Sequence, residues 1–219
     1  MKGTRTTVFF DFDDTLLDTA KFKQLYWECL GKVLGISQEF VKSSYQKLRA
    51  EEKNGFSGPE VHLKDLGVSI QKIPGALIEL RKLILNESSD LIFPEAKLLL
   101  ESQEFRDSYD PRLITVGEPD FQRLKVESSG ILRYFDHQPI YVEPNTRKAD
   151  ALGHVISKNE MFYLVDDKRH EGEAVTESFG HKAVVIIVPR VERDKFAPLI
   201  EDRLGITIEP PHEERLITV

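Results

Sequence analysis

The sequence predicts an α/β fold, in which a doubly wound parallel sheet is interrupted by an all-helical insertion. Short apolar runs alternate with helical stretches along much of the chain, as in βαβ units. The first, fourth and fifth runs lack polar alternation, which is typical of strands that are buried on both faces. Between about residues 17 and 89, by contrast, no stretch has the character of a strand.

The elements of the sheet follow from these runs. The expected strands are Thr7–Phe10, Leu113–Thr115, Ile140–Val142, Phe162–Val165 and Ala183–Val188. Helices are expected over Asp120–Ser129, Thr146–Ser157, Glu171–Phe179 and Phe196–Leu204. Thr146 is the expected N-cap of its helix, and Gly180 is the expected end of the next one. At the C-terminus, Leu216–Val219 is either an edge strand or a frayed end.

The insertion shows helical periodicity throughout. Apolar spacing predicts helices over Ala20–Leu34, Gln38–Glu52, Pro59–Leu66 and Pro74–Leu85. Asp18 is the expected N-cap of the first helix. Turn signals such as Asn54-Gly55 separate the helices, and the sheet resumes near Ile92. The sequence therefore predicts a sheet domain of residues 1–16 and 90–219 and a helical domain of residues 17–89.

The composition is that of a globular protein, with 40% hydrophobic and 31% charged residues. A formal net charge of -7 and the absence of a basic run argue against nucleic-acid binding. The single cysteine, Cys29, excludes an intramolecular disulfide and suits a reducing cytosol. No apolar run approaches the length of a bilayer span. We therefore expect a cytoplasmic protein without nucleic-acid or membrane partners.

Charged and hydroxyl side chains follow the expected strands. They are Asp11, Asp13 and Thr15 after the first run, Thr115 at the end of the second, Arg147 and Lys148 after the third, and Asp166 and Asp167 after the fourth. In open α/β sheets, ligands bind beyond the carboxyl ends of the strands. These side chains are therefore expected to meet in one site.

This set of residues suits metal-assisted phosphoryl transfer. Mg²⁺ prefers oxygen ligands, and Asp11 with Asp167 can supply two carboxylates. A carboxylate can also act as the nucleophile and form an aspartyl-phosphate, while a second carboxyl protonates the leaving oxygen. Thr115 and Lys148 can hold the phosphoryl oxygens and stabilise the charge of transfer.

At this point the sequence resembles the haloacid-dehalogenase-like hydrolase superfamily. DFDDT matches its DxDxT signature, and LITVG, Lys148 and LVDD match its second, third and fourth motifs in order. The stretch from Pro94 to Asp136 resembles the phosphatases of this superfamily that carry a type-1 cap, and the helical insertion resembles that cap. The resemblance implies a Rossmann-like catalytic core, residues 1–16 and 90–219, with a helical cap domain, residues 17–89.

The resemblance also implies roles for the loop after the first strand. Asp11 would be the nucleophile and a metal ligand. Asp13 would be the general acid and base, and its backbone carbonyl would reach the metal. Thr15 would brace the loop. Asp14 occupies the variable place of the signature and is interpreted as structural.

The remaining motifs receive roles in the same way. Thr115 and Lys148 would bind the phosphoryl group, and Lys148 would restrain the charge of Asp11. Asp167 would ligate Mg²⁺, with Asp166 supporting it directly or through water. Glu171 occupies the place of a later acidic residue of the family and would orient a metal-bound water.

Two departures from the family pattern stand out. Val116 follows Thr115 where an asparagine is common, which predicts altered substrate contacts. Ala149 replaces the frequent proline after the motif lysine, which raises the question of whether Arg147 or Lys148 points inward. Lys148 is our choice, because it begins the helix in the same frame as the family's lysine.

The resulting prediction is a Mg²⁺-dependent phosphatase that acts on a small phosphomonoester through an aspartyl-phosphate, as a monomer or homodimer. The alternatives are a phosphomutase, a dehalogenase, a phosphonatase with Lys21 or Lys23 as its Schiff-base lysine, and a phospho-acceptor or binding protein without catalysis. Asp13 argues against a dehalogenase, because a halide leaves without protonation. Substrate specificity is expected to lie in the insertion, near Phe22, Phe56 and His62.

Overall fold

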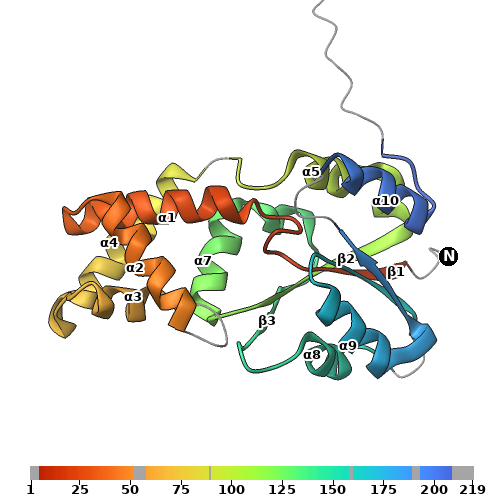
Figure 1. Ribbon diagram of the computed structural model, residues 1–219. Coiled ribbons are helices and arrows are strands. Elements are labelled where there is room, and N and C mark those ends of the chain that lie inside the picture. Colours follow the sequence, from red (N-terminus) through yellow and green to blue (C-terminus); the bar gives the residue numbers. More distant parts are fainter. Residues whose placement is uncertain (1–4, 52–57, 89, 158–159, 189–192, 209–219) are drawn as a thin grey trace, which may run out of the picture.

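The sheet of the protein is parallel throughout. The structure is a computed structural model, which describes residues 5–51, 58–88, 90–157, 160–188 and 193–208. The strands within these ranges are β1 (Thr6–Phe10), β2 (Tyr109–Val116), β3 (Ile140–Val142), β4 (Phe162–Asp166) and β5 (Ala183–Ile187). Their order across the sheet is β3-β2-β1-β4-β5, and all neighbours are parallel (Figure 1). The predicted doubly wound α/β fold is confirmed, with β1 at its centre.

Helices cover both faces of this sheet. The helices of the sheet domain are α5 (Pro94–Glu101), α6 (Gln103–Ser108), α7 (Pro119–Ser129), α8 (Lys148–Val155), α9 (Arg169–Phe179) and α10 (Phe196–Leu204). Short 3₁₀ helices are η1 (Ile70–Lys72), η2 (Ile131–Tyr134), η3 (Gly180–Lys182) and η4 (Arg193–Lys195). On one face, Phe9 packs with Leu152 of α8 and Val175 of α9. On the other face, Val8 and Phe10 belong to the core that includes α5 and α10 (Figure 1).

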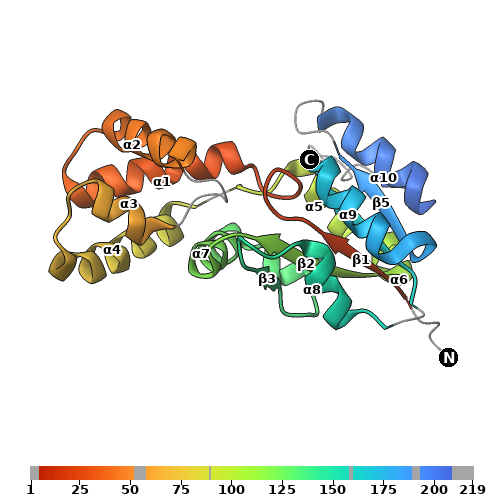
Figure 2. The same ribbon diagram turned by 60° about the horizontal axis from the view of Figure 1, so that its bottom comes forward.

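The helical insertion follows β1 directly. It comprises α1 (Thr19–Leu34), α2 (Gln38–Glu51), α3 (Pro59–Asp65) and α4 (Ile73–Glu87), and it extends away from the sheet (Figure 2). Its buried aromatic and aliphatic side chains continue the core of one sheet face rather than forming a separate cluster. As predicted, Asp18 caps α1, where its side chain accepts a hydrogen bond from the backbone N–H of Lys21 at 3.0 Å.

Two adjacent stretches join the insertion to the sheet domain. The first crossing is residues 16–18 and the second is residues 91–93. The backbone N–H of Asp18 donates to the carbonyl of Leu91 at 2.8 Å, and the N–H of Phe93 donates to the carbonyl of Leu16 at 3.0 Å. An isolated antiparallel bridge between Leu17 and Ile92 lies between these bonds. The two crossings therefore form a short paired hinge at the root of the insertion.

Several expected details differ from the structure. Thr146 is not a helix cap, because α8 begins at Lys148 and Arg147 occupies its N-cap position. Strand β2 begins at Tyr109, four residues before the expected start at Leu113. The expected turn at Asn54-Gly55, the expected strand Leu216–Val219 and Phe56 lie outside the described residues. No helix in the described part of the chain is long and apolar enough to cross a membrane.

Candidate active site

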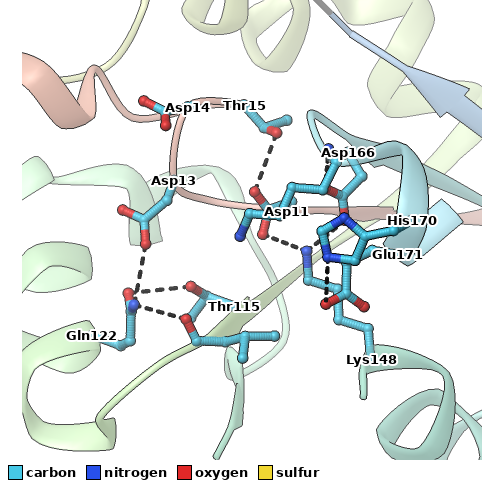
Figure 3. A network of polar contacts seen from close by, with 12 residues as sticks. Asp11, Asp13, Asp14, Thr15, Thr115, Gln122, Lys148, Asp166, His170 and Glu171 are labelled. Carbon is cyan, nitrogen blue, oxygen red and sulfur yellow. Dashed lines mark hydrogen bonds and ion pairs between the residues drawn. The ribbon is translucent and has the colours of Figure 1, made fainter. Parts of the chain in front are cut away.

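Asp11 lies at the carboxyl end of the central strand. Its backbone N–H donates to the carbonyl of Val165 at 2.9 Å, which extends the pairing of β1 with β4 by one residue. Its side chain is only 2% exposed. One carboxylate oxygen, Oδ1, accepts a hydrogen bond from Lys148 Nζ at 2.6 Å, and the other, Oδ2, accepts one from Thr15 Oγ1 at 3.2 Å (Figure 3). The structure thus brings Asp11, Thr15 and Lys148 together.

Lys148 joins the ends of two strands. From the first turn of α8, its fully buried ammonium donates to Asp11 of the β1 end and to Asp166 of the β4 end. Arg147 lies on the surface instead and pairs with Asp150. Of the two cations considered from the sequence, Lys148 is therefore the one that points inward.

The charges at this edge of the sheet do not balance. Burial raises the pKa of both Asp11 and Asp166 above the ordinary value, although the Lys148 ammonium opposes this shift. Burial would lower the pKa of Lys148, but the two carboxylates beside it outweigh burial and raise it. One ammonium cannot neutralise two buried carboxylates. The cluster therefore favours one more positive charge.

A divalent cation fits this cluster. Carboxylate oxygens of Asp11, Asp166 and Asp167 lie within 4.8 Å of one another. They are the hard oxygen donors that Mg²⁺ prefers, and with Lys148 they leave a net negative charge for the ion to neutralise. The donor set thus suits Mg²⁺, with these three residues as its holders. The Asp13 carboxylate does not belong to this group of ligand atoms.

Asp13 turns toward α7 instead. Its Oδ2 accepts a hydrogen bond from Gln122 Nε2 at 3.1 Å (Figure 3). Its Oδ1 accepts one from Lys125 Nζ at 2.6 Å. Thr19 Oγ1 donates to Oδ1 at 3.3 Å. Burial alone would raise the pKa of Asp13, but the adjacent Lys125 ammonium and these hydrogen bonds hold it below the ordinary value. Asp13 is therefore ionised in this arrangement.

Gln122 connects Thr115 to Asp13. Thr115, at the end of β2, donates from Oγ1 to Gln122 Oε1 at 3.2 Å, and Gln122 Nε2 also donates to the carbonyl of Val116 at 3.0 Å. The side chain lies over Gly117, where an added Cβ would come within 2.3 Å of Gln122 Nε2. One amide thus ties the strand end that carries Thr115 to the loop that carries Asp13.

Gln122 and Lys125 are site residues that the sequence reasoning missed. They are three residues apart on α7, so they share a helix face, and both are 5% exposed. The available signal was their position between the apolar residues Phe121, Leu124 and Val126, directly after the second motif. A lysine on an amphipathic helix is ordinarily solvated, so Lys125 was not predicted to point into the site.

Glu171 is not brought into the carboxylate cluster. It lies in the first turn of α9, with its Oε1 3.9 Å from His170 Nε2 (Figure 3). Asp166, by contrast, is anchored, because its Oδ1 accepts a hydrogen bond from the backbone N–H of Lys168 at 2.9 Å. The expected role of Glu171 in orienting a metal-bound water therefore stays a prediction.

The expected specificity residues of the insertion are core residues. His62 is fully buried, and its Nδ1 is 2.9 Å from the hydroxyl of Tyr26. Burial lowers the pKa of His62 to about 4, so the ring is neutral. Phe22 is 1% exposed and packs edge-on against Phe121 of α7. Phe22 and His62, near which specificity was expected, are thus buried and hold the insertion together and against α7. That specificity lies in the insertion stays a prediction.

Comparisons with known proteins define the fold. No family model matches the sequence, and no curated protein matches it. Among solved structures, a haloacid dehalogenase-like hydrolase from Burkholderia xenovorans is 18% identical with a TM-score of 0.60, covering 84% of this chain and 82% of that one. A protein described as a β-phosphoglucomutase from Thermotoga maritima is 15% identical with a TM-score of 0.54, covering 90% and 99%.

A third structure, a 2-haloacid dehalogenase from Pseudomonas syringae, is 18% identical with a TM-score of 0.53, covering 82% of this chain and 85% of that one. The architecture is thus an α/β, Rossmann-like sheet with a helical insertion after its first strand. More particularly, it is the fold of the haloacid dehalogenase-like hydrolases, as the sequence resemblance implied.

Proposed function

We propose that this chain belongs to the haloacid dehalogenase-like hydrolases and is a Mg²⁺-dependent phosphatase of a small phosphomonoester. The observation that carries the proposal is the environment of Asp11. A buried carboxylate at the centre of the sheet is held by Lys148 and Thr15, and it shares a cluster of potential metal ligands with two further aspartates. Burying such a group of charges is energetically costly. Its presence therefore favours a role in chemistry or binding.

In the proposed first step, an Asp11 oxygen attacks phosphorus in line with the leaving group. The new P–O bond forms while the bond to the alcohol oxygen breaks, and Asp13 supplies the proton that this oxygen needs. Thr115 and Lys148 hold the phosphoryl oxygens. A Mg²⁺ ion held by Asp11, Asp166 and Asp167 would supply positive charge for these oxygens.

In the second step, Asp13 removes a proton from water, whose oxygen attacks phosphorus and releases Asp11 as a free carboxylate. The Lys125 ammonium beside Asp13 holds the pKa of its carboxyl below the ordinary value, which suits this base role. Proton donation in the first step requires Asp13 to turn away from Lys125 and take up a proton. Rotation of the Asp13 side chain, on a loop whose backbone stays in place, is therefore part of the proposed cycle.

We propose that the insertion, residues 17–89, acts as a cap on the catalytic core. A cavity of about 630 Å³ lies between α3, α4 and α7, lined in part by Pro59, Arg81, Phe121 and Arg123. It separates the insertion from α7, and the described residues that line it include none of Asp11, Asp13, Thr115 and Lys148. Closing of a cap would exclude water from the aspartyl-phosphate until Asp13 is in position.

A phosphomutase is the second candidate, because one of the similar structures is described as a β-phosphoglucomutase. The two reactions share the first step and differ in whether the phosphorylated enzyme transfers its phosphoryl group to water or to a second substrate oxygen. A dehalogenase is disfavoured, because Asp13 is held by two side chains of α7 next to the site, and halide release needs no acid.

The test is a panel of phosphorylated metabolites together with 4-nitrophenyl phosphate, assayed for free phosphate with Mg²⁺ and with EDTA. The proposal expects phosphate release that requires Mg²⁺. Activity that persists in EDTA contradicts the metal role. Isomerised phosphosugar without free phosphate identifies a mutase, and halide release from 2-chloropropionate identifies a dehalogenase.

A further inference from the structure

Arg193 reaches the loop that carries Asp13 from the far end of the chain. It lies in η4, just before α10, and its side chain is only 16% exposed. Its Nη1 donates to the carbonyl of Asp14 at 3.2 Å, and its Nη2 donates to the carbonyl of Thr15 at 3.0 Å. One guanidinium therefore binds two successive carbonyls between the proposed acid and the first crossing to the insertion.

The guanidinium is itself held on other sides. Its Nε donates to Glu95 Oε1 of α5 at 2.6 Å. Its central carbon lies 3.8 Å from the ring centroid of Phe93 and 4.8 Å from that of Phe196. Stacking on aromatic rings and a charge-assisted hydrogen bond fix the plane of an arginine, so that its other donors are aimed in advance.

The loop cannot satisfy these two carbonyls by its own turn. Within the turn, the N–H groups of Leu16 and Leu17 both donate to the carbonyl of Phe12, at 3.0 and 2.9 Å. Asp14 has a φ of 61°, a left-handed conformation that non-glycine residues rarely adopt. Its carbonyl and that of Thr15 are turned toward Arg193 instead. An external donor thus stabilises a bend that the backbone does not favour.

The same contact reaches the hinge of the insertion. Phe93, on which Arg193 stacks, belongs to the second crossing, and its N–H donates to the carbonyl of Leu16 in the first crossing. Arg193 therefore touches the loop, the second crossing and the start of α10 at once.

We infer that Arg193 is a positioning residue, which fixes the bend between Asp11 and α1 and thereby aims Asp13 at the leaving group. This inference rests on the proposed function, since it assigns Arg193 an effect on the acid step. A lysine at position 193 would keep the charge. Its single ammonium cannot bind both carbonyls and Glu95 in one plane while stacking on two rings.

The experiment compares the full-length wild type with Arg193→Lys, Arg193→Ala and a control, Arg203→Ala. Arg203 lies on α10 and is 60% exposed, and it pairs with its neighbour Asp202. Steady-state rates are measured with an alkyl phosphate, whose leaving oxygen needs a proton, and with 4-nitrophenyl phosphate, whose leaving group departs without one. The second readout is amide hydrogen exchange at Leu16 and Leu17.

For Arg193→Lys, kcat for the alkyl phosphate is expected to fall on the order of tenfold to a hundredfold at nearly constant KM, as for a small misplacement of a catalytic group. The fall for 4-nitrophenyl phosphate is expected to be much smaller. Exchange at Leu16 and Leu17 should accelerate while the amides of β1 stay protected, and Arg203→Ala should match wild type in every readout.

Equal losses with both substrates would overturn the positioning role, and so would unchanged exchange at the loop. If Arg193→Ala is poorly folded, Arg193→Lys alone decides. If the wild type hydrolyses neither substrate, the proposed function fails. Hydrogen exchange still decides whether Arg193 holds the loop, so the two failures are distinguishable.

Discussion

The edge of the sheet and the interior of the insertion both bury polar side chains, but in opposite forms. At the sheet edge, the buried ammonium of Lys148 forms ion pairs with the buried carboxylates of Asp11 and Asp166. In the insertion, Tyr26 and His62 are buried as a neutral hydrogen-bonded pair, because burial lowers the pKa of His62 to about 4. The buried side chains at the sheet edge are thus charged, whereas the buried histidine of the insertion is neutral.

This difference separates structural from functional burial. A neutral hydrogen bond within an aromatic cluster stabilises a fold at little cost. A buried ion group is commonly no more stable than a well-packed apolar group of the same volume, so stability alone does not explain it. The buried charges at the carboxyl edge of the sheet therefore indicate a functional site, whereas the neutral His62 indicates a structural role.

The largest expected effect comes from removing the central cation. Lys148→Met leaves buried carboxylates without their ammonium and should lower the free energy of unfolding by about 3–5 kcal/mol. Hydrolytic activity should be lost. Without the Lys148 ammonium, the carboxylates of the cluster carry a larger net negative charge and should bind a cation more strongly. Mg²⁺ should therefore raise the thermal midpoint of this variant more than that of wild type.

Arg147→Met is the matched control, since Arg147 precedes Lys148 and forms an exposed ion pair with Asp150. Its loss should lower the free energy of unfolding far less than the loss of Lys148 does, because solvent screens an exposed ion pair. Denaturant titration of both variants checks the contrast. Equal losses in the free energy of unfolding of the two variants would show that the buried ion pairs of Lys148 contribute no more to stability than an exposed pair does.

A second expected effect concerns the proposed acid and base. Asp13→Asn removes the proton donor and should lower kcat for an alkyl phosphate by about 10²–10⁴-fold, with little change in KM. Asp14→Asn is the control, because asparagine tolerates the left-handed backbone at this position. Steady-state kinetics of the two variants decide. A similar loss in both would assign the effect to the shape of the loop rather than to the Asp13 proton.

The neutral pair of the insertion predicts a pH effect. The folded pKa of His62, about 4, lies below its ordinary 6.5, so this residue stabilises the fold fully only above pH 6.5. As the pH falls, the unfolded chain binds a proton that the folded chain excludes, and the free energy of unfolding should decrease by about 1–2 kcal/mol at pH 5. The decrease should end near pH 4.

His62→Gln lacks this proton and serves as the reference. Urea unfolding of both proteins at pH 7 and pH 5 measures the difference. The wild type should lose more stability than the variant between these two values. Parallel losses would mean that His62 is protonated in the folded protein and that the contrast between the two regions fails.

The smallest expected effect tests the amide beside the charges. Gly117→Ala pushes Gln122 Nε2 aside, because the new Cβ would come within 2.3 Å of it. The lost hydrogen bonds to Asp13 and Val116 should cost about 1 kcal/mol, and backbone strain at the Gly117 φ of 155° adds to this cost. Gly153→Ala, in α8, meets nothing within 4 Å and should be neutral or stabilising. Thermal unfolding compares them, and destabilisation by Gly153→Ala alone would contradict the packing described for Gln122.

Much of the fold is legible in the sequence, because the central strands are continuous apolar runs and the insertion is strongly periodic. The start of β2 was not, since Asp110-Pro111-Arg112 resembles a turn. In the sheet these residues lie opposite Thr7, Val8 and Phe9 of β1, and Arg112 binds Asp110. A charged pair such as Asp110 and Arg112 is compatible with the backbone hydrogen bonds of a strand, but it interrupts the run of apolar residues by which a buried strand is predicted.

The motif residues of the candidate site were also predictable, because strand ends are fixed once the strands are known. Lys125 and Arg193 were not. Each acts across more than one hundred residues of chain, on Asp13 and on the carbonyls of Asp14 and Thr15. Local pattern treats both as solvated cations, and only tertiary structure shows their partners.

In the proposed reaction, the buried carboxylate of Asp11 accepts the phosphoryl group. The direct measurement is to quench the enzyme during turnover of a phosphomonoester with Mg²⁺, reduce it with borohydride, and analyse its peptides by mass spectrometry. An aspartyl-phosphate is reduced to homoserine, so we expect homoserine at position 11 that is absent without Mg²⁺. Turnover with Asp11 unmodified, or with the modification at another residue, would contradict it.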